Sequence, residues 1–319
     1  MVAVVNSQPD PLAVLLHGPT GSGKTTLALA LGERFQGEVV SCDSVAVYRG
    51  LDLGSAKPTP DDQRRLPHHL IDVANPDRLY TAGEYSRQAR AALASIAARG
   101  HLPIVTGGTG LYLRALTLGL FAGPPRQQHL RARLARSLAR HSPGWLHSIL
   151  TRFDPLAAQR IHPNDSPKLI RAIEVCLALS KPISAAFAEG RDALTGFRLL
   201  RIGLNPPRAQ LYERLNQRAE AMFAAGLVEE TRSLLARYGP VPALDSLGYR
   251  QAAAHLCGEL SLPQAVAAAQ QGHRNYAKRQ LTWFRREPDV HWIERFGDSP
   301  AALAEASALV RPHLHPTAE

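Results

Sequence analysis

The sequence predicts an α/β fold, in which helices flank a mainly parallel sheet and an all-helical domain interrupts the sheet-forming segments. Short apolar runs alternate with stretches of helical periodicity before residue 123 and after residue 196. Two of these runs end in glycine-rich turns that lead into helical patterns, as in the strand–loop–helix units of parallel sheets. Residues 123–196 instead read as several helices broken by prolines, without a convincing strand. We therefore expect a catalytic core of residues 1–122 and 197–319 and a helical insertion of residues 123–196.

The first glycine-rich turn fits the phosphate-binding pattern G-x-x-x-x-G-K-[ST] at every fixed position. It follows the apolar run 12–16 and opens into the helical pattern 26–31, which is the context that the pattern requires. Its residues are Gly18, Pro19, Thr20, Gly21, Ser22, Gly23, Lys24 and Thr25. Backbone amides and the positive helix end would surround a phosphate group, while Lys24 adds a full charge and Thr25 can hold Mg²⁺. The loop predicts a sheet like that of P-loop NTPases, but it does not identify the phosphate compound.

Polar residues follow two other predicted strands. Asp43 stands near the carboxyl end of the β-rich run 37–44, and in parallel sheets ligands bind outside such strand ends. The run 103–106 leads into a second glycine-rich turn, in which Thr109 supplies a hydroxyl donor. We expect Asp43 and Thr109 to face the phosphate-binding loop.

Two arginines on a later helix complete the predicted anion site. The pattern 208–226 is strongly helical, with its apolar residues on one face. Arg214 and Arg218 are four residues apart, so they share a face and can reach one anion together.

The charge of the chain favours a polyanionic partner. The formal net charge is +10, and between Arg126 and Lys181 there are ten basic residues against three acidic ones. Near the C-terminus, Arg274, Lys278 and Arg285 share the face of a further predicted helix. Such surfaces suit contact with a nucleic-acid backbone.

The remaining composition argues against several other classes of protein. Cys42, Cys176 and Cys257 are too few and too far apart to predict a disulfide framework or a cysteine-based zinc site. No stretch approaches the roughly 18–20 apolar residues that a membrane span needs, and no secretory signal is recognised. We expect a cytoplasmic protein that does not enter a membrane.

These residues alone leave three functions open. A small-molecule kinase would use Lys24 and Mg²⁺ to transfer a phosphoryl group from ATP. In a transferase, diphosphate would instead be the leaving group, and another group would pass to a nucleic acid. An RNA-binding module switched by a nucleotide would leave Asp43 and Thr109 without a role.

Several blocks along the chain also resemble one known family. They are GPTGSGKT at 18–25, DS at 43–44, YRGLD at 48–52, GSAKP at 54–58, GGT at 107–109, LY at 111–112, RIHPND at 160–165, RAIEV at 171–175, GYRQ at 248–251 and KRQLTW at 278–283. In this order they resemble the bacterial tRNA dimethylallyltransferases, also called isopentenyl transferases. The resemblance runs from about residue 12 to residue 294, which makes the kinase a minor alternative.

The resemblance implies transfer of a dimethylallyl group from dimethylallyl diphosphate to N6 of the adenosine 3′-adjacent to a tRNA anticodon, with release of diphosphate. Asp43 would orient the amine and accept its proton. The phosphate-binding loop, Arg214 and a Mg²⁺ ion held at Thr25 would bind the diphosphate. They would also stabilise the negative charge that grows on it during the reaction. The catalytic residues implied are Asp43, Thr109, Arg218 and Lys24.

The adenosine must leave the anticodon stack to react, so contacts to the anticodon stem-loop are expected to compensate for unstacking. The resemblance suggests contacts from Asp43, Ser44, Val45, Ala46, Thr109, Arg131, Pro167, Lys168, Leu169, Ile170, Arg171, Leu247, Gly248, Tyr249 and Arg250, and the basic helix face adds Lys278 and Arg285. Ala46 stands where many members have glutamine, so the amide contact of those members is not expected here. We expect a monomer.

Overall fold

The structure is a computed structural model that describes residues 10–121, 123–188 and 190–314. It forms two compact units. The first contains the described residues of 1–116 and 194–319, and the second is Thr117–Ala193. The insertion thus begins and ends a few residues before the limits expected from the sequence.

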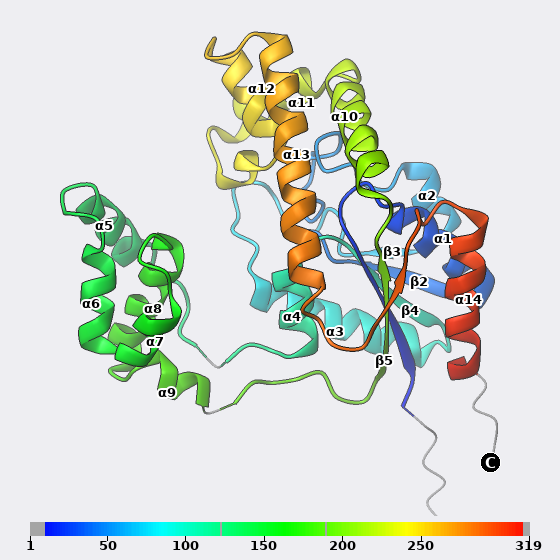
Figure 1. The fold of residues 1–319 in the computed structure, drawn as a ribbon, viewed down its shortest axis with the longest axis horizontal. Coiled ribbons are helices and arrows are strands. Elements are labelled where there is room, and N and C mark those ends of the chain that lie inside the picture. The colour runs from blue at the N-terminus through cyan, green and yellow to red at the C-terminus, as the bar shows by residue number, and fades with distance from the viewer. Residues whose placement is uncertain (1–9, 122, 189, 315–319) are drawn as a thin grey trace, which may run out of the picture. The chain divides into compact units, whose positions relative to one another are not determined.

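A six-stranded sheet is the centre of the first unit, and every pair of neighbouring strands in it is parallel. The strand order is β3-β2-β4-β1-β5-β6. Figure 1 labels β2, β3, β4 and β5. The strands are β1 (Leu12–His17), β2 (Gly37–Ser41), β3 (His68–His69), β4 (Leu102–Thr106), β5 (Arg198–Leu204) and β6 (Val290–Ile293). The predicted α/β fold with a parallel sheet flanked by helices is confirmed.

Helices of the first unit follow the strands in the order expected for crossover connections. They are α1 (Lys24–Phe35), α2 (Pro60–Arg65), α3 (Ala82–Ala98), α4 (Gly110–Thr117), α10 (Arg208–Ala224), α11 (Leu227–Tyr238), the 3₁₀ helix η1 (Pro242–Asp245), α12 (Tyr249–Leu256), α13 (Leu262–Phe284) and α14 (Pro300–Leu314). No helix in the described ranges is long and apolar enough to cross a membrane.

The sheet is buried on both faces because successive strand residues point to opposite sides. On β1, Ala13 and Leu15 belong to one apolar cluster, together with residues of α3 and α13. Val14 and Leu16 belong to another cluster, which contains residues of α1 and α14. Since both faces are covered, only the ends of the strands remain open to a ligand.

The second unit is entirely helical within its described residues. Its helices are α5 (Gln128–Leu138), α6 (Trp145–Phe153), α7 (Pro155–Arg160), α8 (Ser166–Leu179) and α9 (Ile183–Ala188). They enclose an apolar cluster of their own, in which Leu146, Leu150 and Leu169 are almost completely buried. Gly119 has a φ of 71°, and a Cβ atom there would lie 1.9 Å from the backbone oxygen of Asp192. The two ends of this unit therefore lie side by side.

Candidate active site

The phosphate-binding loop connects β1 to α1, as the sequence predicts. Gly21 and Gly23 have φ values of 78° and 87°, a backbone region that favours glycine. Gly23 is the N-cap of α1, so the helix begins at Lys24. The unpaired amides of the first helical turn therefore face the loop and can bind an anion.

Lys24 is held inside the loop. Its Nζ donates to the backbone oxygen of Pro19 at 2.7 Å, and the residue is only 9% exposed. Burial and the nearby charge of Arg218 lower the pKa of Lys24 to about 7, although Asp43 opposes this shift. Because a bound anion favours the ammonium form, Lys24 is suited to gain its charge as a phosphate ligand binds.

The second glycine-rich turn follows β4, the strand next to β1 in the sheet. Gly107 packs so closely on Cys42 that a Cβ atom would lie 2.1 Å from the Cys42 backbone oxygen. The backbone N–H of Thr109 donates to the same oxygen at 3.1 Å. The turn is thereby fixed against the segment that carries Asp43.

Asp43 has a defined orientation. Its Oδ1 accepts hydrogen bonds from the backbone amides of Val45 at 2.8 Å and Ala46 at 3.1 Å. The next residue, Ser44, donates its backbone N–H to Oγ1 of Thr109 at 2.9 Å. The structure therefore brings the predicted residues Asp43 and Thr109 to one place.

Two cavities meet around these residues. The first has a volume of about 290 Å³ and is lined by the phosphate-binding loop, Asp43, both predicted arginines and the turn 107–108. The second measures about 310 Å³ and is lined by Ser44, Val45, Leu247 and Arg250, among others. Both cavities share the lining residues Thr20, Asp43, Ser55, Arg218 and Tyr276.

The two arginines of α10 differ in their surroundings. Nη1 of Arg214 donates to Oδ2 of Asp298 at 2.9 Å, and its guanidinium lies 4.0 Å from the Phe296 ring centroid. Within the described part of the chain, Arg218 makes no hydrogen bond or salt bridge, and burial lowers its pKa while Asp43 raises it. Arg218 is therefore the arginine with free donors for an anion in the first cavity.

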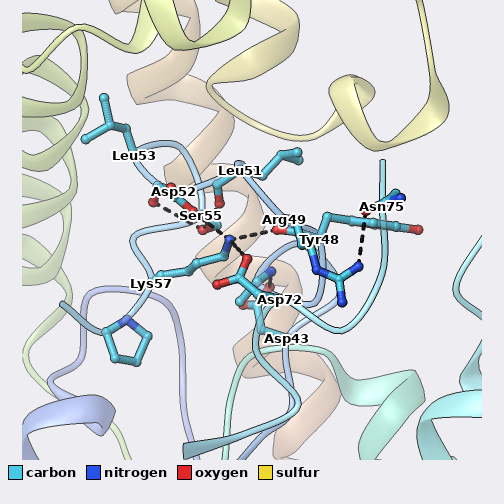
Figure 2. A network of polar contacts seen from close by, with 12 residues as sticks. Asp43, Tyr48, Arg49, Leu51, Asp52, Leu53, Ser55, Lys57, Asp72 and Asn75 are labelled. Atoms are coloured by element: carbon cyan, nitrogen blue, oxygen red, sulfur yellow. Dashed lines mark hydrogen bonds and ion pairs between the residues drawn. The ribbon is translucent and has the colours of Figure 1, made fainter. Parts of the chain in front are cut away.

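Lys57 lines the first cavity, and Figure 2 shows the polar contacts of its ammonium group. Its Nζ donates to the backbone oxygen of Tyr48 at 2.7 Å, to Asp52 at 2.7 Å and to Asp72 at 2.6 Å. The Lys57 side chain is only 5% exposed, and its ammonium carries two salt bridges. These contacts order the loop between β2 and α2, from which Ser55 and Ala56 face the cavity.

The segment 247–250 is only partly available to a ligand. Leu247 and Arg250 line the second cavity. Tyr249 is completely buried, donates its hydroxyl to Glu230 at 2.6 Å and accepts the amide of Gly54 at 3.1 Å. Direct tRNA contact by the Tyr249 side chain does not fit this geometry, because its hydroxyl joins helix α11 to the loop that contains Gly54. Gly248 is likewise buried, at the N-cap of α12.

Within the second unit, the predicted residues of α8 also separate into two groups. Leu169 and Ile170 are 0% and 8% exposed in the helical core, so contact of their side chains with tRNA does not fit this structure. Pro167 and Lys168 are exposed in the first turn, and Lys168 forms a salt bridge with Asp165. In a helix, some residues of such a segment face the core and others face solvent. A continuous range of predicted contacts therefore includes residues of both kinds.

Arg131 and Arg171 of the same unit share one buried carboxylate. They lie 3.3 Å and 2.7 Å from Oε2 of Glu174, whose side chain is completely buried. Arg171 also donates to the backbone oxygen of Pro124 at 2.9 Å. Both arginines thus stabilise the helical unit, and each is still partly exposed.

Helix α13 carries both a basic surface and two site residues that the sequence interpretation missed. Lys278 and Arg285 are exposed, as expected for contacts to a phosphate backbone. Tyr276 and Gln280 instead line the first cavity. Gln280 lies within the block 278–283, so the resemblance contains a signal for it, but the periodicity gives no reason to choose it.

The site fits a magnesium ion bound together with phosphate. Thr25 lines the first cavity with Asp43 and Asp298, and Mg²⁺ prefers oxygen ligands. The described residues contain no group of three or more histidine, cysteine, aspartate or glutamate side chains suited to a metal. Thr25 and the oxygens of the substrate would therefore have to supply much of the coordination.

Together, the parallel sheet, the loop after β1 and the polar cavity define an α/β protein whose site is suited to phosphate groups. Residues 46–287 match the family described as IPP transferase. A tRNA dimethylallyltransferase of Koribacter versatilis is 61% identical over 303 residues, which cover 95% of this chain and 99% of the relative. A tRNA dimethylallyltransferase of Solibacter usitatus is 53% identical, with 94% and 98% covered.

Solved structures agree with this result. The tRNA isopentenylpyrophosphate transferase from Bacillus halodurans is 33% identical, with a TM-score of 0.70 and 95% and 96% of the two chains covered. A eukaryotic dimethylallyltransferase acting on tRNA is 24% identical, with a TM-score of 0.76 over 94% of this chain and 77% of its own, and supports the fold. The chain belongs to the IPP transferase family.

Proposed function

We propose that the protein is a tRNA dimethylallyltransferase. It transfers a dimethylallyl group from dimethylallyl diphosphate to N6 of the adenosine 3′-adjacent to the anticodon. The observation that carries this proposal is the pair of cavities that meet at Asp43 and Arg218. One cavity suits a diphosphate, and the other suits a base that enters from tRNA.

In this proposal Asp43 positions the amine and accepts its proton. Oδ1 of Asp43 is occupied by two backbone amides, which fix the carboxylate plane. We assign Oδ2 to the N6 proton. The N6 lone pair forms the new C–N bond as the allylic C–O bond breaks, and the electron pair of that bond leaves with the diphosphate.

The first cavity stabilises the charge of the departing diphosphate. Loop amides, Lys24 and Arg218 present positive charge where negative charge increases, and preorganised donors of this kind supply a large part of catalysis. Thr109 is next to Asp43 through Ser44, and we assign its hydroxyl to the same reacting region. Thr25 would hold a Mg²⁺ ion, which would neutralise the diphosphate further.

We assign the second cavity to the flipped adenosine. Ser44, Val45, Leu247 and Arg250 line it, and His273 forms a further part of the wall. Burial and Arg218 lower the pKa of His273 to about 4, so this imidazole is neutral at physiological pH. The wall therefore combines the apolar side chains of Val45 and Leu247 and a neutral imidazole with charged groups such as Arg250, so it can contact both the face and the polar edge of a purine.

Exposed basic residues supply the backbone contacts in this proposal. Lys278 and Arg285 offer them on α13, and Lys168 offers one on α8. We assign to Arg131 and Arg171 a supporting role beside Glu174, with their exposed edges available to phosphate. We propose a monomer, because the first unit alone lines both cavities, and we place the reaction in the cytoplasm, where its tRNA substrate is used.

The test compares two donors with one acceptor. Purified protein is incubated with unmodified tRNA, Mg²⁺ and either dimethylallyl diphosphate or ATP, and the nucleosides are then weighed. A gain of one prenyl unit on adenosine is expected only with the prenyl donor. Phosphorylation with ATP and no prenylation would instead establish the kinase, which the transferase relatives disfavour.

A further inference from the structure

Gln280 connects the two glycine-rich loops of the site. Its Oε1 accepts the backbone N–H of Thr20 in the phosphate-binding loop at 2.8 Å. Its Nε2 donates to the backbone oxygen of Gly108 in the second turn at 2.9 Å. Both ends of one amide are thus used, and the residue is only 4% exposed.

Gln280 can approach the second turn this closely only because residue 108 is a glycine. A Cβ atom on Gly108 would lie 2.1 Å from Nε2 of Gln280. Tyr276, one helical turn earlier on α13, donates its hydroxyl to the same Gly108 oxygen at 3.3 Å. Two side chains of one helix therefore hold this carbonyl, and only Gln280 also reaches the phosphate-binding loop.

The bridge also selects which loop amides remain for a ligand. A phosphate-binding loop works through backbone N–H groups that point at phosphate oxygens. The Thr20 amide is already used by Gln280, and the Ser22 amide donates to the Pro19 backbone oxygen at 3.3 Å. The amides of Gly21, Gly23 and the first turn of α1 are therefore the ones left for a ligand. The position of Thr20 sets where those amides lie relative to Thr109 and Asp43.

We propose that Gln280 is a positioning residue that sets the spacing between the two loops and thereby the geometry of the diphosphate site. It touches neither reacting atom, and it acts through Thr20 and Gly108. Because it lies on α13 between the exposed residues Lys278 and Arg285, the helix assigned to tRNA contact also holds the diphosphate site together. The expected effect of Gln280 on diphosphate binding does not depend on the proposed function. Its expected effect on prenylation rests on that function.

Replacement of Gln280 by glutamate removes one of its two hydrogen bonds and keeps the other. Gln280→Glu keeps the acceptor for Thr20 but directs a second oxygen at the Gly108 carbonyl, where repulsion replaces a hydrogen bond. A protonated carboxylic acid can again donate to Gly108, and burial raises the pKa of such a carboxyl group. The defect of this variant is therefore expected to diminish as the pH falls.

The experiment measures binding of inorganic diphosphate with Mg²⁺ by calorimetry, and prenylation of tRNA in parallel. Gln280→Leu is expected to weaken diphosphate binding about tenfold or more, because each lost bond leaves a buried partner unsatisfied. Gln280→Glu is expected to bind about tenfold more weakly than wild type near pH 8 and to approach wild type near pH 6. Tyr276→Phe, which removes only one donor to Gly108, is expected to have a smaller effect.

Gln271→Glu is the matched control, because it introduces the same charge at an exposed position of the same helix. It is expected to bind diphosphate as wild type does at both pH values. A ratio of Gln280→Glu to wild-type affinity that does not change between about pH 8 and pH 6 would overturn the positioning role, as would wild-type affinity in Gln280→Leu. If wild type binds diphosphate but prenylates no tRNA, the proposed function fails while the bridge is still tested by binding.

Discussion

Binding of diphosphate is expected to depend on pH through Lys24. In the free protein, burial and Arg218 lower the pKa of Lys24 to about 7, and its Nζ faces the Pro19 carbonyl. A bound diphosphate places negative charge beside the ammonium and raises this pKa. Above pH 7, binding must therefore take up a proton.

The size of this effect follows from the free-state pKa. With a pKa of about 7, roughly one tenth of the free molecules carry a charged Lys24 near pH 8, and most carry it near pH 6. The affinity component due to Lys24 is then about tenfold weaker near pH 8 than near pH 6, or about 1.4 kcal/mol. This component falls a further tenfold for each pH unit above that.

Calorimetry in buffers of different ionisation enthalpy measures the proton uptake directly. We expect nearly one proton per diphosphate near pH 8 from Lys24 and almost none near pH 6. The matched variant is Lys24→Arg, which stays charged, and the titration of the ligand itself is common to both proteins. Equal proton uptake by wild type and Lys24→Arg would refute the reasoning. In Arg218→Gln, the midpoint is expected to rise, because a repelling charge is removed.

Three other results are expected. Asp43→Ala should lower single-turnover prenylation by about 10²–10⁴-fold while tRNA affinity in filter binding changes little, and wild-type turnover would contradict the role of this carboxylate. The tRNA affinity should fall steeply with salt, since basic contacts release counterions, and a flat log–log plot would exclude the basic surfaces as docking sites. Hydrogen bonds from His69, Arg99 and His101 outweigh burial and lower the pKa of Glu38 to about 2. Because this folded-state pKa is below the usual 4.5, the stabilisation is present above pH 4.5 and is lost as pH falls toward 2. Glu38→Gln should therefore lower the free energy of unfolding by roughly 2–4 kcal/mol at neutral pH and by much less near pH 2, as measured by urea titration.

The residues that the sequence predicts well are those whose role is local. The phosphate-binding loop is defined by glycines at a fixed spacing, and the positive φ angles of Gly18 and Gly23 are consistent with that pattern. Asp43 and Thr109 follow neighbouring strands of a parallel sheet, so the topology itself brings them together.

The sequence does not predict the roles of residues that depend on contacts with distant parts of the chain. Gln280 is 260 positions from Thr20 and 172 from Gly108, and no local pattern predicts such a bridge. Conversely, the resemblance suggests tRNA contact by Tyr249, Leu169 and Ile170, yet their side chains are buried. A resemblance to a family points to whole segments of the chain, whereas packing decides which side chains of a segment reach solvent.

The close approach of Gly119 to Asp192 makes the helical unit a removable module. Its two ends leave the core as neighbouring chain segments, and its apolar cluster is built from its own helices. We therefore expect that a short turn can replace the residues between Gly119 and Asp192, and that the helices of a relative can be exchanged at the same junction. Such an exchange would change the surface available for RNA while leaving the β1 loop and its neighbours as they are.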